Sequence, residues 1–187
     1  MITRYGVTRP EAWSGAAARL TFVDGPLDFG WVDCGVTAEF LGNFLGGLAA
    51  KAGLDANEVR HTTGYLTNEL LENAVKFRAS GAGGVVLEAR FDGSTFELIL
   101  SNFAPEETTA GFQKFLGELE SRDPGDLLIE RIEANALDPS SGSGLGILTL
   151  MSDYAVRFGW TFEQQAEGEP VRVETYAALA LSGPDRS

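Results

Sequence analysis

The sequence has very little cysteine and histidine, with one residue of each among its 187 residues. Cys34 alone cannot form an internal disulfide, and Cys34 with His61 cannot supply the ligands of a Cys/His zinc site. No base stands beside Cys34 in the sequence, and no dimerisation hairpin accompanies His61. We therefore interpret Cys34 as an inert thiol rather than a nucleophile, and His61 as a structural residue rather than a phosphoacceptor.

Basic residues are also scarce, because 14 Lys and Arg stand against 27 Asp and Glu, giving a formal net charge of -13. Such a balance disfavours a surface that follows nucleic-acid phosphates. The chain also lacks any apolar run near the roughly 18 residues of a membrane-spanning helix, and residues 1–15 contain no signal-peptide core. We expect a cytoplasmic protein that binds neither nucleic acid nor membrane.

The hydrophobic content of 44% is enough for one compact core. We expect a single domain over residues 1–181 and a disordered tail over 182–187. Apolar periodicity predicts a helix over 37–51, although Gly42, Gly46 and Gly47 weaken it, so that tertiary packing must hold it. A second helix, capped by Asp55 and Glu58, is predicted to end near residue 80.

Alternating β-branched and aromatic residues predict the strands. They cover 19–23, then 85–90 and 96–101 as a hairpin around Asp92-Gly93, and finally 156–162 and 171–181. Helices are expected over 111–120, over 126–137 and from the glycine run near 144 to about 153. This order predicts an α+β fold, a two-layer sandwich in which a mixed or antiparallel sheet carries helices on one face.

The connection over residues 104–141 is long. Connections beyond about 12 to 15 residues are usually lids, binding elements or disordered segments. Its helical pieces are separated by Asp123-Pro124-Gly125, and one of them carries an apolar face that could cover a pocket. We expect this segment to act as a lid.

Glu69, Asn73 and Lys76 share one stripe of the second helix, because they stand four and three residues apart. Such a stripe could orient a water through the carboxylate, bind a hard cation through the amide oxygen and neutralise a phosphate through the ammonium group. The alternative is a solvated helix face, in which Glu72 and Lys76 form an ordinary ion pair.

Gly142, Gly144 and Gly146 precede a short helix, where free backbone N–H groups favour an anion such as phosphate. The spacing fits neither the dinucleotide motif G-x-G-x-x-G nor the Walker type of phosphate loop. The alternative interpretation is a flexible turn.

The two features together resemble the GHKL superfamily, which contains histidine-kinase-type ATPase domains, gyrase-type ATPases and anti-sigma-factor kinases. Asn68–Phe77 (NELLENAVKF) is similar to the asparagine box of this family, and Gly142–Ile147 (GSGLGI) is similar to its second glycine box. The resemblance covers about residues 58–181. It implies the Bergerat ATP-binding fold, with ATP and Mg as cofactors.

The resemblance also implies roles for individual residues. Asn73 would be the magnesium ligand, Glu69 the base or water-orienting carboxylate, and Lys76 a phosphate neighbour. The hinge of the nucleotide lid would include the residues of the second box, namely Gly142, Gly144, Leu145 and Gly146.

The chain departs from the family where D-x-G-x-G is expected, since Ser101 and Asn102 begin the corresponding stretch Ser-Asn-Phe-Ala-Pro. A serine or asparagine oxygen would still accept a hydrogen bond from adenine, but the carboxylate is lost, which predicts weaker ATP binding or altered base selectivity.

This replacement and the long lid resemble the SiaB-like branch of bacterial regulators. The resemblance implies a protein serine/threonine kinase that acts on a regulatory partner protein. The alternatives are a degenerate, non-catalytic interaction module and a stand-alone ATPase. The sequence does not reveal the oligomeric state.

Overall fold

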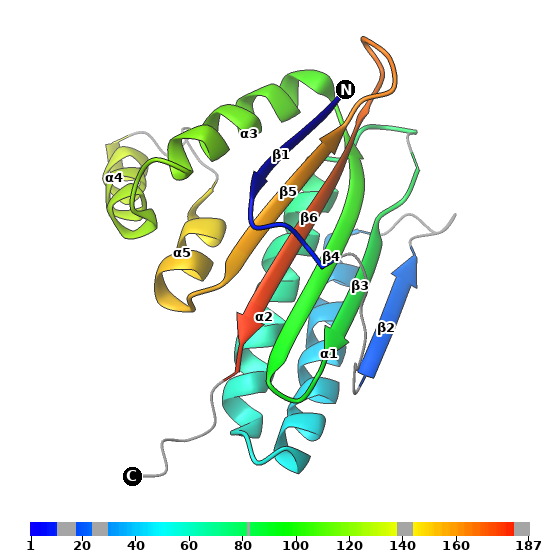
Figure 1. The fold of residues 1–187 in the computed structure, drawn as a ribbon, viewed down its shortest axis with the longest axis vertical. Coiled ribbons are helices and arrows are strands. Elements are labelled where there is room, and N and C mark those ends of the chain that lie inside the picture. Colours follow the sequence, from blue (N-terminus) through cyan, green and yellow to red (C-terminus); the bar gives the residue numbers. More distant parts are fainter. Residues whose placement is uncertain (11–17, 24–29, 82, 138–143, 182–187) are drawn as a thin grey trace.

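The computed structural model describes residues 1–10, 18–23, 30–81, 83–137 and 144–181. These form an α+β fold in which α1 and α2 lie behind a sheet, and α3, α4 and α5 lie beside β1 and β5 (Figure 1). The elements in chain order are β1 (Ile2–Gly6), β2 (Ala18–Val23), α1 (Trp31–Lys51), α2 (Ala56–Lys76), β3 (Val86–Phe91), β4 (Thr95–Ala104), α3 (Glu106–Leu119), α4 (Pro124–Leu137), α5 (Leu145–Asp153), β5 (Arg157–Glu163) and β6 (Val171–Ala180). The predicted α+β class is confirmed.

The sheet has the strand order β1-β5-β6-β4-β3-β2, and each of these pairings is antiparallel. An antiparallel sheet was one of the two predicted arrangements. The central strands β4 and β6 pair along their full length, from Thr95 opposite Ala180 to Ala104 opposite Val171. Alternate side chains of these strands enter the main core beneath the helices.

Glycines allow α1 and α2 to pack very closely. A Cβ atom at Gly42 would lie 2.6 Å from the backbone oxygen of Arg60, and one at Gly46 would lie 2.7 Å from that of Ala56. Both distances are shorter than real Cβ contacts. Two of the three glycines that weaken the intrinsic helix propensity of α1 therefore lie at its contact with α2. This agrees with the expectation that tertiary packing holds the helix.

Several element boundaries differ from the sequence-based prediction. The strand β1 was missed, and it pairs with β5 at an edge of the sheet. The helix α1 begins six residues before the predicted start, where the Asp33 carboxylate accepts a hydrogen bond of 2.8 Å from the N–H of Gly30. The helix α2 begins at its predicted cap, with Asp55 accepting from two backbone N–H groups, but it ends at Lys76 rather than near residue 80.

The long connection contains two full helices, and both begin earlier than predicted. Within it, Phe112 of α3 contacts Trp160 and Phe162 of β5, and Leu116 is fully buried. The helix α3 therefore packs on the same face of the sheet as α2. The last residues of the predicted lid, 138–141, and the tail 182–187 lie outside the described residues. In the part of the chain that the structure describes, no helix has both the length and the apolar character needed to cross a bilayer.

Candidate functional site

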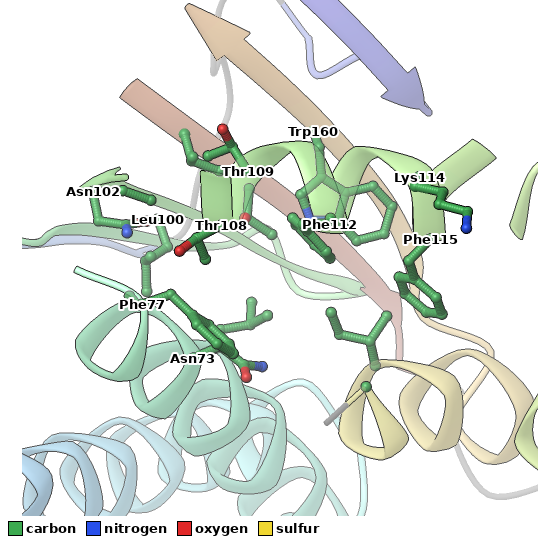
Figure 2. Close-up of a pocket in the computed structure, with 18 of the residues that line it drawn as sticks. Asn73, Phe77, Leu100, Asn102, Thr108, Thr109, Phe112, Lys114, Phe115 and Trp160 are labelled. Carbon is green, nitrogen blue, oxygen red and sulfur yellow. The ribbon is translucent and has the colours of Figure 1, made fainter. Parts of the chain in front are cut away.

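A cavity of about 430 Å³ lies between α2, the helix-facing side of the sheet, α3 and the start of α5 (Figure 2). Its walls come from segments that are distant in the sequence. The lining includes Asn73 and Phe77 from α2, Leu100 and Asn102 from β4, Thr109, Phe112 and Phe115 from α3, Gly144 and Ile147 around the start of α5, and Trp160 and Thr175 from the last two strands.

The floor of the cavity is set by the strand register. Leu100, Thr175 and Trp160 form one row across β4, β6 and β5, because Thr175 is opposite both of the other residues. Asn102 belongs to the adjacent row, two residues along β4. Directly opposite residues share one face of an antiparallel sheet, so these four side chains face the helices.

Three residues on this floor carry polar groups that have no hydrogen-bond partner among the described residues, and one of these groups, the Trp160 indole Nε1, is itself buried. Asn102 is 5% exposed and Thr175 is 8% exposed, and neither side chain forms a hydrogen bond within that part of the chain. The indole Nε1 of Trp160 is also buried without a partner there. Buried polar groups are normally paired, because an unpaired one costs about 1–3 kcal/mol. Since these residues line a cavity, this pattern favours a ligand with polar edges.

The stripe on α2 reaches the start of α5. Glu69 and Asn73 are one helical turn apart, and a Cβ atom at Gly146 would lie 2.8 Å from the Cδ of Glu69 and closer still to its Oε2. The carboxylate thus occupies the space that the missing side chain leaves open. Burial, and to a lesser extent the neighbouring carboxylate of Glu72, raise the pKa of Glu69. A raised pKa makes this group a better proton acceptor near neutral pH.

The structure brings together some of the predicted site residues and separates others. Asn73, Asn102 and Gly144 line the cavity, and Gly146 contacts Glu69 beside it. Leu145 is the first residue of α5 and is partly buried.

Ser101, in contrast, points to the opposite face of the sheet, where it accepts a hydrogen bond of 3.3 Å from Arg172. Lys76 is exposed and lies 5.1 Å from the centre of the Phe77 ring, outside the cavity lining. Gly142 lies outside the described residues.

Sequence reasoning did not single out Lys114 or Glu118, and it offered Arg131 only as one of four arginines that could supplement Lys76. The long connection to which all three residues belong was expected to cover a pocket. The Arg131 guanidinium lies 3.7 Å from the Glu118 carboxylate and 5.3 Å from the centre of the Phe115 ring. These contacts hold α4 against α3. The pattern of aromatic residues in α3 was the only available signal, because the sequence does not show which arginines converge.

Neither the lone cysteine nor a metal cluster adds to this site. Cys34 is fully buried, and burial raises the pKa of its thiol to about 11, so the thiol is protonated at neutral pH. The described residues contain no group of three or more His, Cys, Asp or Glu side chains that could hold a metal ion. The Asn73 oxygen and the nearby Glu69 suit Mg²⁺ only if phosphate oxygens and water complete the shell, which is a common arrangement for this ion.

Comparison with known proteins gives no match to any family model, curated protein or solved structure.

Proposed function

We propose that this cavity binds ATP together with Mg²⁺, and that the chain transfers phosphate to a serine or threonine of a regulatory partner protein. The observation that carries the proposal is the contact between Glu69 and Gly146 at the edge of a cavity lined by Asn73. The two sequence features that resemble the GHKL superfamily, far apart in the chain, thus meet at one place.

The shape of the cavity supports a particular orientation of the nucleotide. The buried floor around Asn102 and Thr175 suits the base, and the part of the lining that contains Asn73 and Gly144 suits the phosphates. A volume of about 430 Å³ lies within the range of small-ligand pockets, about 300–1,000 Å³. Lys114 and Arg131 on the covering helices add positive charge to a chain whose overall charge is negative.

The chemistry follows from the position of Glu69. In the proposed transfer, the hydroxyl oxygen of the acceptor forms a bond to the γ-phosphorus, the bond to the β–γ bridging oxygen breaks, and ADP leaves. The Glu69 carboxylate takes the hydroxyl proton, which its raised pKa favours. Mg²⁺ held by Asn73 would neutralise phosphate charge, which is the main need of phosphoryl transfer.

Isothermal titration with ATP, with and without Mg²⁺, tests the binding step. We expect Mg²⁺-dependent heat at millimolar ATP that chelation abolishes. Asn73→Ala should remove this dependence, whereas Asn57→Ala, an exposed residue on the same helix, should not. If Asn73→Ala unfolds the chain and the folded fraction still binds ATP, the stripe is structural.

The second candidate function is a non-catalytic interaction module that keeps the fold without using ATP. The observation that favours it is the floor of the cavity, where an amide stands in place of the carboxylate that the family resemblance implies. No heat with ATP under either condition would favour this candidate.

A further inference from the structure

The buried floor of the cavity offers amide and hydroxyl groups rather than a carboxylate. Among the described residues that line the cavity, the only carboxylate belongs to Glu118, which sits on α3 and pairs with Arg131. On the floor itself, Asn102 and Thr175 each provide both a donor and an acceptor, and Trp160 provides a donor. At Asn102 and Thr175, the ligand can therefore either donate or accept the hydrogen bond.

The Asn102 side chain is free to serve a ligand in either orientation. It forms no hydrogen bond with another described residue, so no neighbour in that part of the chain fixes which end of the amide is oxygen and which is nitrogen. Figure 2 places it at one end of the cavity, on the same side as Leu100 and Thr108. A half-turn about its last torsion angle exchanges the donor and the acceptor.

Purine bases present two complementary patterns at the edge formed by N1 and the 6-substituent. A 6-amino purine has a donor at N6 and an acceptor at N1, and a 6-oxo purine has an acceptor at O6 and a donor at N1–H. An amide can pair with either pattern through two hydrogen bonds, one donated and one accepted.

We infer that the site binds purine nucleotides without strong selection between adenine and guanine, and that Asn102 reads the 6-position by turning its amide. This inference rests on the proposed nucleotide-binding function. It names the base specificity of that site, which the resemblance alone does not provide.

The test compares ATP, GTP and purine riboside triphosphate, which lacks a 6-substituent, by titration calorimetry on the full chain with Mg²⁺. We expect the Kd values of ATP and GTP to agree within about threefold, and purine riboside triphosphate to bind about tenfold more weakly because it loses one hydrogen bond. In Asn102→Leu, the three ligands should converge to a common, weaker affinity. Ser101→Ala is the matched control, because it changes the adjacent residue on the opposite face, and it should preserve the wild-type pattern.

Each outcome has a distinct meaning. If none of the three nucleotides binds the wild-type chain, the proposed function itself is wrong. If one of ATP and GTP binds more than about tenfold tighter than the other, nucleotide binding stands and the inference about base selection fails. If the penalty for the missing 6-substituent persists in Asn102→Leu, another residue reads that position. The wild-type comparison decides between adenine and guanine even if that variant does not fold, and Asn102→Ala then repeats the variant test.

Discussion

Gly146 shows how one missing side chain can shape a site. Alanine is normally preferred to glycine inside a helix, by about 0.5–1 kcal/mol. At this position the added Cβ atom would overlap the Glu69 carboxylate, which approaches the helix backbone. Glycine is therefore favoured at this position because of the Glu69 carboxylate, which belongs to another helix, α2.

We expect Gly146→Ala to destabilise the fold by about 1–3 kcal/mol, because the carboxylate must move. Glu69→Ala removes the overlapping atoms, so the double variant should recover most of the loss. Gly117→Ala in α3 is the control, since nothing lies within 4 Å of a Cβ atom there, and it should be neutral or stabilising. Urea unfolding of the four chains measures the coupling, and strictly additive effects would contradict the contact.

The raised pKa of Glu69 predicts a pH-dependent stability. When both states are protonated, Glu69 contributes nothing. As the pH rises above the ordinary carboxyl value of 4.5, the unfolded chain releases this proton first, so the folded state loses stability until the folded pKa has been passed. Glu69→Gln should therefore melt near the wild-type temperature at pH 4 and at a higher temperature than wild type at pH 8, because glutamine carries no charge to bury. A difference of equal size at both pH values would show that packing, and not ionisation, is responsible.

Glu69→Gln also separates binding from catalysis. Glutamine keeps the size of the side chain but cannot accept the proton, so phosphate transfer should fall by about 10²–10⁴-fold while the Kd for ATP stays nearly unchanged. Radiolabel transfer to the partner protein and calorimetry measure the two effects. An equal loss of both would place Glu69 in ligand binding instead.

At the scale of elements, neighbouring glycines of α1 have opposite roles. Gly46 faces the backbone of α2, where an added Cβ atom would lie 2.7 Å from the oxygen of Ala56, and Gly47 faces open space. We expect Gly46→Ala to cost about 1–3 kcal/mol and Gly47→Ala to contribute about 0.5–1 kcal/mol. Thermal unfolding of this adjacent pair measures the difference. Two variants with equal effects would mean that α1 and α2 are not held by this close approach.

Local patterns in the sequence were sufficient for much of this architecture. The cap at Asp55, the turn at Asp92-Gly93 and the periodicity of α2 each depend on nearby residues, and the structure has all three. The strand β1 was missed because it is short and only partly buried, so its pairing with β5 and not its composition defines it.

The site required information that local patterns do not contain. The stripe at Glu69 and Asn73 follows from helical spacing, and its meeting with Gly146 was expected only through the family resemblance. Asn102 faces the cavity and Ser101 does not, because successive side chains of a strand point to opposite faces of the sheet. Thr175 and Trp160 belong to the floor because of the pairing register of β4, β6 and β5. Register is a property of the whole sheet, which is why these two residues were not singled out as ligands.

At the scale of the whole molecule, α4 is the covering helix that we expect to respond to a ligand. It packs against α5 and reaches α3 through the Arg131–Glu118 pair, and none of its larger contacts involves the sheet. We expect ATP with Mg²⁺ to slow amide hydrogen exchange across Pro124–Leu137, while exchange in α2 changes little. Slow exchange in α4 that does not respond to nucleotide would show a fixed structural element and would end the lid interpretation.

The edge strand β1 has a consequence for how the chain is made. Its partner β5 lies about 150 residues further along, so at about 5–20 residues per second β1 leaves the ribosome roughly 8–30 seconds before β5. During this interval the strand has two open edges, and its partly exposed, alternating side chains, including Arg4, make it a poor template for pairing with other chains. A strand that is synthesised long before its partner is thus among the last to find its place in the sheet.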